Sequence, residues 1–205
     1  PECVWENRRL LCEALALPSG CLLLPRQVHG TEIAVIGENF RYLPEDIRLR
    51  LLDGVDALLT DRTGYCIGVT TADCVPLLFY DPEKRVIGAA HAGWRGTVAR
   101  IGLHCIRKMQ KEYGCKADDI RVTVGPSISR DNFEVGPEVI RAFRSAGFPE
   151  EKRTVWHPET GKFHLDLREA NRHTLLAAGI RDSHIEVSAE CTYEQHTRFF
   201  SARRE

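Results

Sequence analysis

The sequence has no long apolar run, no excess of either charge and almost no methionine. Its 205 residues carry 28 basic and 29 acidic side chains, which gives a net charge of −1. That balance provides no general attraction to nucleic acid or to a membrane surface. No apolar run approaches the roughly 20 residues that cross a bilayer as a helix. These absences predict a protein with neither a nucleic-acid partner nor a membrane partner.

The eight cysteines include no CxxC pair, and several of them lie inside apolar runs. In a chain of this length, that distribution favours free thiols in the reducing cytoplasm over a disulfide framework. The one methionine, Met109, is expected in a helix, which argues against an axial thioether of the kind found in blue-copper centres. The sequence begins at Pro1 with no initiator methionine, and we expect its N-terminus to be incomplete.

Apolar periodicity predicts one domain over residues 1–205, a length that supports one good core. Helices are expected at 6–17, 97–113, 137–146 and 167–178, and strands at 21–24, 32–36, 57–60, 66–70, 75–80, 86–90, 120–124, 185–187 and 199–201. Residues 37–54 are expected to form a loop, and 75–90 a β-hairpin. Strand pairs mixed with isolated helices indicate an α+β or mixed α/β fold.

Three potential metal ligands stand at the ends of expected strands. His29 lies in a turn, Cys74 directly precedes an apolar run, and His91 directly follows one. Two imidazoles and one thiolate would make an open zinc site with a fourth position for water or substrate. The spacing matches no regular zinc motif. A buried thiol with two turn histidines, or a Cys74 nucleophile with His91 as its base, therefore remain alternatives.

Several arginines are candidate anion ligands. Arg95 stands between glycines ahead of an expected helix, where a guanidinium can hold phosphate or carboxylate in a bidentate manner. Arg62 and Arg203, which Arg204 follows, are further candidates. Exposed ion pairs of little energetic value are the alternative for each of them.

Two polar residues neighbour the potential metal ligands. Asp73 precedes Cys74 and could orient an imidazole, act as a general acid or base, or cap a turn. Gln27 stands two residues before His29 and would face the same way on an extended segment. The remaining histidines are interpreted as structural or surface residues: His104, His157, His164, His173, His184 and His196.

Four segments, QVHGT at 27–31, TADCVPL at 71–77, HAGWRG at 91–96 and FFSARR at 199–204, resemble the YfiH-like laccase-domain family. Its members are also called multicopper polyphenol oxidoreductases or purine nucleoside phosphorylases. The likeness covers nearly the whole chain in the right order. It implies a mixed α/β sandwich with helices around mixed sheets, and a metal pocket formed by His29, Cys74 and His91. Residues 127–133 depart from the family pattern.

The resemblance also implies purine nucleosides and phosphate as partners. The activities implied are phosphorolysis of adenosine, inosine, guanosine and methylthioadenosine, together with adenosine deamination. One Cys and two His suit zinc better than a cluster of coppers, although copper-dependent phenol oxidation is an older interpretation of the family. In this scheme Cys74 and His91 serve the metal chemistry, Asp73 could move a proton, and Arg95 could hold phosphate. A Cys-His hydrolase is the further alternative.

Overall fold

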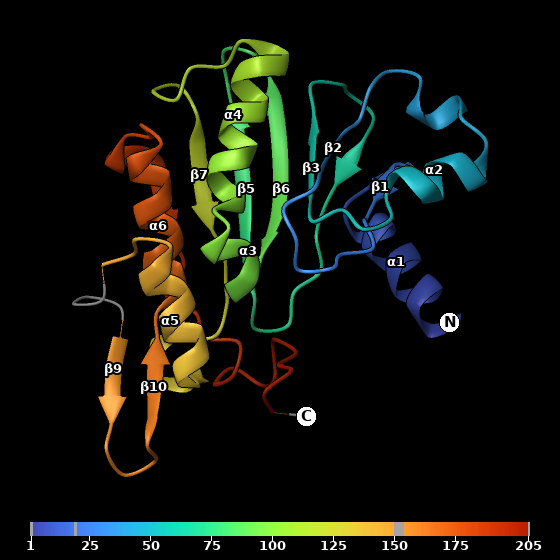
Figure 1. Cartoon of the computed structure of the whole chain (residues 1–205). Coiled ribbons are helices and arrows are strands. Elements are labelled where there is room, and N and C mark those ends of the chain that lie inside the picture. Colours follow the sequence, from blue (N-terminus) through green and yellow to red (C-terminus); the bar gives the residue numbers. More distant parts are fainter. Residues whose placement is uncertain (1, 19, 150–153, 205) are drawn as a thin grey trace.

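The computed structural model describes residues 2–18, 20–149 and 154–204 (Figure 1). The helices are α1 (Glu2–Ala14), α2 (Glu45–Leu51), α3 (Trp94–Val98), α4 (Ile101–Tyr113), α5 (Pro137–Ser145) and α6 (Leu167–Ala177), with 3₁₀ turns η1 (Phe40–Tyr42), η2 (Arg130–Asn132) and η3 (Asp182–His184). The strands are β1 (Leu22–Leu23), β2 (Ile33–Val35), β3 (Ala57–Thr60), β4 (Cys66–Ile67), β5 (Val75–Asp81), β6 (Val86–Ala92), β7 (Arg121–Val124), β8 (Glu134–Val135), β9 (Thr154–His157), β10 (Lys162–Leu165) and β11 (Ile185–Val187).

A six-stranded mixed sheet forms the centre of the molecule, in the order β11-β7-β5-β6-β3-β2. Its middle four strands run antiparallel, while β11 pairs with β7 and β2 pairs with β3 in parallel. The β5–β6 hairpin is the one predicted from the sequence. Smaller sheets join β8, β10 and β9, and β1 with β4. Mixed sheets with flanking helices confirm the predicted fold class.

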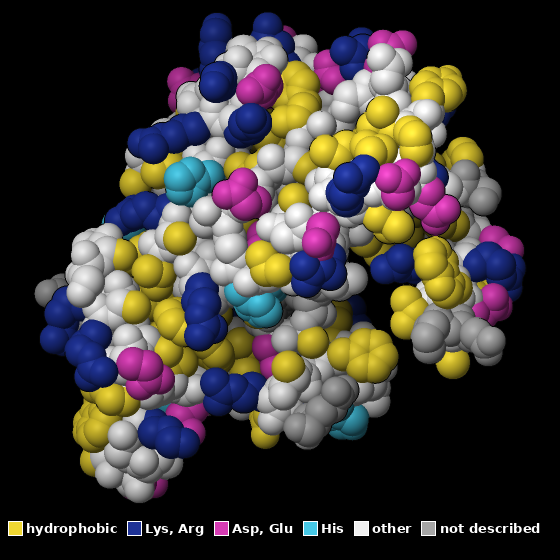
Figure 2. Space-filling model, turned by 45° about the vertical axis from the view of Figure 1, so that its right-hand side comes forward, with side chains coloured by type: hydrophobic (Ala, Val, Ile, Leu, Met, Phe, Trp, Pro, Cys, Tyr) yellow, Lys and Arg dark blue, Asp and Glu magenta, His cyan; other side chains and the backbone are white. Residues whose placement is uncertain are grey.

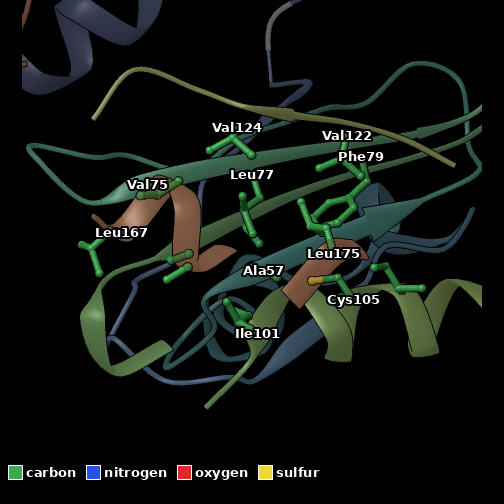
Figure 3. Packing of buried hydrophobic residues seen from close by; sticks show 14 of the residues in the cluster. Ala57, Val75, Leu77, Phe79, Ile101, Cys105, Val122, Val124, Leu167 and Leu175 are labelled. Atoms are coloured by element: carbon green, nitrogen blue, oxygen red, sulfur yellow. The ribbon is translucent and has the colours of Figure 1, made fainter. Parts of the chain in front are cut away.

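The main core lies between one face of this sheet and the helices. Along β5, Val75, Leu77 and Phe79 are buried, and the residues between them are half-buried or exposed, which is the alternation of a strand covered on one face. Figure 3 shows these side chains directed toward Ile101 of α4 and Leu175 of α6. Each such side chain contributes about 1.5–3 kcal/mol when it is removed from water. The hairpin that carries the site is therefore firmly held.

The structure corrects several predicted elements. Residues 37–54 contain η1 and α2 rather than only loop; acidic side chains in the first turn of α2 and arginines in its last stabilise that short helix through its dipole. Residues 199–201 form no strand, and the β9–β10 hairpin was not predicted. The helix expected over 97–113 is split, because Arg100 takes a left-handed backbone conformation (φ 59°) between α3 and α4.

Figure 2 shows acidic and basic side chains interspersed over one face of the molecule, in keeping with the small net charge. Within the described ranges, no helix combines the length and the apolar character that a membrane span requires. Because the charges are mixed, the face in Figure 2 is neither a basic nor an acidic patch.

Candidate metal centre

Three side chains far apart in the sequence meet at one end of the β5–β6 hairpin. His29 lies in the loop before β2, Cys74 directly precedes β5, and His91 lies near the end of β6. One ligand atom of each residue lies within 4.8 Å of those of the other two. Because Pro76 pairs with His91 in the antiparallel ladder, the start of β5 lies beside the end of β6. The predicted convergence of the three donors is present.

The centre is open toward solvent on the side of His29. His29 is exposed, Cys74 is half-buried and His91 is buried. The two imidazole rings meet edge to face, with centroids 4.7 Å apart. Among the residues that the structure describes, no other group of three His, Cys, Asp or Glu side chains brings its ligand atoms this close. Three protein donors with one open side are the arrangement of a catalytic zinc site.

Asp56, which no sequence motif marks, joins two of the three donors. Its Oδ1 lies 2.8 Å from Nδ1 of His91 and accepts the backbone N–H of His29 at 3.0 Å. Its Oδ2 accepts the N–H groups of Val28 and Gly30 at 3.2 and 2.7 Å. With Nδ1 engaged by Asp56, Nε2 is the nitrogen of His91 that remains for a ligand, as in metal-binding imidazoles supported by a carboxylate.

Burial and these contacts set the charge states of the pair. Burial would raise the pKa of Asp56, but the hydrogen bonds from His91, Gly30 and Val28 together bring that pKa below its ordinary value. Burial lowers the pKa of His91, against the opposing effect of Asp56, and the nearby His29 lowers it further. Asp56 is therefore ionised and His91 neutral at neutral pH, so that the Nε2 lone pair is available to a ligand.

The environment of Cys74 bears on the choice between a nucleophile and a metal ligand. Burial, followed by the carboxylates of Asp73 and Asp56, raises the pKa of the Cys74 thiol to about 11. Without a neighbouring cation, this thiol stays protonated at neutral pH and is a poor nucleophile. A bound divalent ion would hold it as the thiolate.

Gly93 leaves the space in which the donors meet. A Cβ atom at this position would lie 2.9 Å from Cδ2 of His29 and 3.1 Å from Sγ of Cys74, closer than side-chain atoms pack. Tetrahedral bonds of zinc to nitrogen and sulfur place the donor atoms about 3.4–3.6 Å apart. The donor atoms here lie within 4.8 Å of one another, so they must move closer together to reach those separations. The residue types and the space that this glycine leaves fit a bound metal ion.

Two residues of the centre take backbone conformations that are costly for side-chain-bearing residues. His29 has φ of 62° and Asp73 has φ of 86°. Such positions cost about 1–3 kcal/mol and tend to cluster at functional sites. The hydrogen bonds that Asp56 accepts from residues 28–30 hold the first of them in place.

The structure places two predicted site residues beside the centre, where each makes contacts within the protein. The Gln27 amide donates to the carbonyl of Thr70 and accepts its N–H, both at 2.8 Å. It thus ties the His29 loop to the segment that leads into Cys74. The buried carboxylate of Asp73 accepts hydrogen bonds from the C-terminal segment rather than facing the three donors.

Arg95 and Arg203 come together at one pocket of about 400 Å³. Trp94, Phe133 and Lys162 also line it. The Arg95 guanidinium lies 4.3 Å from the Trp94 ring centroid, and that of Arg203 lies 5.3 Å from the Phe133 centroid. Arg95 lies in the first turn of the five-residue α3 rather than ahead of the long helix expected. Glu134 and Glu138 also line the pocket, and Lys162 pairs with Glu134.

Arg62 is not brought to the centre. It follows β3, whose other end adjoins Asp56, and its guanidinium forms ion pairs with Asp61 at 3.0 Å and Glu38 at 3.7 Å. It lines a separate pocket with Tyr65 and Arg85. Its role as an anion ligand stays a prediction from its charge.

The class of the molecule is defined by a mixed sheet and an open His-Cys-His centre. The centre lies where β5 begins and β6 ends. The family model described as multi-copper polyphenol oxidoreductase laccase matches residues 1–205. The chain therefore belongs to this family, as the sequence motifs predict.

Relatives of the chain carry enzyme names. It is 44% identical over 203 residues to a purine nucleoside phosphorylase of Bacteroides thetaiotaomicron, covering 99% of this chain and 75% of that protein. It is 45% identical to adenosine deaminase RL5 of an unknown prokaryotic organism, covering 98% and 76%. The crystal structure of the Bacillus licheniformis hypothetical protein YfiH superposes with a TM-score of 0.87 at 32% identity, covering 97% and 74%.

Proposed function

We propose that this chain is a zinc-dependent enzyme that cleaves purine nucleosides with phosphate and deaminates adenosine, with methylthioadenosine among its substrates. The single observation that carries the proposal is the convergence of His29, Cys74 and His91 within 4.8 Å on an open side of the molecule. The phosphorylase and deaminase names of relatives at 44% and 45% identity supply the substrate class.

His29, Cys74 and His91 would hold the metal. When bound, zinc lowers the pKa of a coordinated water to about 7 and polarises groups that it contacts. The protein's part is to fix the donors: Asp56 sets the orientation of His91, and Gly93 leaves the required space. This division of labour suits deamination, in which water adds to C6 of adenosine and ammonia leaves.

Phosphorolysis requires a place for phosphate beside the centre. A phosphate oxygen bonds to C1′ while the bond from C1′ to the base breaks, and the base leaves with its electron pair. We assign the phosphate to the pocket of Arg95 and Arg203. Within the described part of the chain neither guanidinium forms an ion pair, and each lies over an aromatic ring. Their charge is therefore available to an oxyanion.

The alternatives fit the residues less well. A multicopper oxidase needs several histidine-rich copper sites, whereas the described residues form one three-donor group and Met109 is buried in the core. A Cys-His hydrolase needs a reactive thiolate, and the pKa of Cys74 is raised to about 11.

The eight free cysteines support a cytoplasmic location.

One product assay tests the proposal. Purified protein is incubated with adenosine, inosine or methylthioadenosine, with and without phosphate, and the products are identified by mass. We expect free base and sugar phosphate only when phosphate is present, and inosine from adenosine in either condition. Cys74→Ala should abolish both reactions. Absence of any product from all three nucleosides would refute the assignment.

A further inference from the structure

The C-terminal segment 188–204 runs from the edge strand β11 back to the metal centre without forming a helix or strand of its own. In Figure 1 the last part of this segment lies below the sheet, on the side of α3. This segment carries Arg203, which lines the pocket assigned above to phosphate. A segment without regular secondary structure lacks a helix or sheet pattern of backbone hydrogen bonds. Contacts with other parts of the protein must therefore hold it beside the pocket.

The carboxylate of Asp73 binds this segment at three points. Oδ1 accepts the hydroxyl of Thr192 at 2.7 Å, and Oδ2 accepts the hydroxyl of Ser201 at 3.0 Å. Oδ2 also accepts the backbone N–H of Arg203 at 2.9 Å. These partners lie 119, 128 and 130 residues away in the sequence. Asp73, Thr192 and Ser201 are all buried, where hydrogen bonds to a charged group are strongest.

The segment is also tied to itself, so that fixing two of its points fixes the loop between them. The guanidinium of Arg204 donates to the carbonyls of Thr192, Tyr193 and Phe199. The backbone of Thr192 donates to Ser127 at 3.1 Å. The Asp73 carboxylate therefore fastens a folded loop, which Ser127 also contacts, to the start of β5.

We propose, as an extension of the proposed function, that Asp73 is a positioning residue: its carboxylate fastens segment 188–204 to the start of β5 and thereby places Arg203 in the phosphate pocket. A role as proton carrier suits Asp73 less well, because its two oxygens accept three hydrogen bonds from one segment and the side chain is buried. Asp73 thus links the metal centre to the phosphate pocket, because it precedes Cys74 in the chain and accepts the N–H of Arg203. We call this set of contacts of the Asp73 carboxylate the joint.

The test removes contacts of the joint in two ways, by changing Asp73 and by changing its partner Ser201. Asp73→Gly deletes the carboxylate at a residue whose φ of 86° glycine accepts readily. Ser201→Ala removes one bond from the opposite side and leaves β5 untouched. Asp73→Asn is the conservative variant, since asparagine also tolerates this conformation. Asp81→Asn is the matched control. Asp81 is a buried carboxylate at the end of β5, the strand that begins two residues after Asp73, and it accepts the N–H groups of Glu83 and Lys84.

The first readout is the protection of Arg203 from phenylglyoxal by inorganic phosphate, followed by mass-resolved peptides. We expect Asp73→Gly to raise the phosphate concentration for half-maximal protection about tenfold, and Ser201→Ala to raise it about threefold. Asp73→Asn should fall between Asp73→Gly and the wild type, and Asp81→Asn should match the wild type. Equal protection in all variants would overturn the proposal.

The second readout is the kinetics of inosine phosphorolysis. Asp73→Gly should raise KM for phosphate and change kcat at saturating phosphate far less. A fall in kcat with KM for phosphate unchanged would instead make Asp73 a group that acts on the reacting atoms. If the wild type cleaves no nucleoside, the proposed function fails. The joint is then judged by hydrogen exchange of the Arg203 amide, which should quicken about tenfold in Asp73→Gly; an unchanged rate would refute it.

Discussion

At the scale of single residues, Asp56 governs the centre without being one of its three donors. It is fully buried, and it accepts the N–H groups of residues 28–30 as well as Nδ1 of His91. The same carboxylate therefore shapes the loop of one imidazole and orients the ring of another. Its sequence position, one residue before the short strand β3, looks like an ordinary turn acid.

Asp56→Ala should weaken both metal binding and the fold. Loss of a carboxylate that supports a liganding imidazole typically costs 10–100-fold in metal affinity, and a buried donor without an acceptor costs about 1–3 kcal/mol. Zinc affinity by chelator competition and urea unfolding measure the two effects. Asp46→Ala, an exposed residue of α2, is the control. An unchanged zinc affinity would contradict the role given to Asp56.

Alkylation of Cys74 in metal-free protein should depend steeply on pH. Burial and the carboxylates of Asp73 and Asp56 raise its pKa to about 11, so its thiolate fraction at pH 7 is only about one in ten thousand. Its rate with iodoacetamide should rise about tenfold per pH unit and level off near pH 11. Site-resolved mass spectrometry measures this rate. Fast alkylation at pH 7 would show an activated thiol instead.

At the scale of elements, the turn from β6 into α3 lies beside the metal centre and leaves space for it. Its Gly93 has an extended backbone (φ −65°, ψ 173°) that other residues adopt readily. Glycine is required there for lack of space, because a side chain at this position would collide with His29 and Cys74.

Gly93→Ala should fold and lose metal. The added methyl would stand 2.9 Å from Cδ2 of His29, so the exposed imidazole would be displaced while the buried sheet remains. Circular dichroism checks the fold, and metal analysis after dialysis against zinc checks occupancy. Gly37→Ala is a matched control, because a Cβ there would meet nothing within 4 Å. Full zinc occupancy in Gly93→Ala would contradict the packing argument.

The elements also show what the sequence could predict. The β5–β6 hairpin was found because apolar runs flank a Pro-containing turn, and His91 and Cys74 were found because they end those runs. Helix α2 and the β9–β10 hairpin were missed because their apolar positions are few and largely exposed. Asp56 was missed because its partners lie 26–35 residues away, and only strand pairing brings them together.

At the scale of the whole molecule, one sheet gathers the site from distant segments. Pairing of β3 with β6 sets Asp56 beside His91, pairing of β5 with β6 sets Cys74 beside it, and Asp73 draws in the C-terminal segment. A bound metal would link the first two of these. The metal should therefore stabilise the entire fold and not only the site.

Removal of the metal should lower Tm. A ligand present at a hundred times its Kd stabilises the folded state by about 2.7 kcal/mol, which in a chain of this size corresponds to roughly 5–10 °C. Differential scanning calorimetry with and without a chelator measures the shift. Cys74→Ala should show no chelator effect. Identical melting of the wild type in both conditions would mean that the centre holds no metal.

The most direct test of the account follows hypoxanthine release from inosine in the presence of phosphate, in wild-type protein that is first stripped of metal and then reconstituted with zinc. We predict that stripping abolishes release and that about one zinc ion per chain restores it. Undiminished release by the metal-free protein would contradict the claim that His29, Cys74 and His91 act as a metal centre.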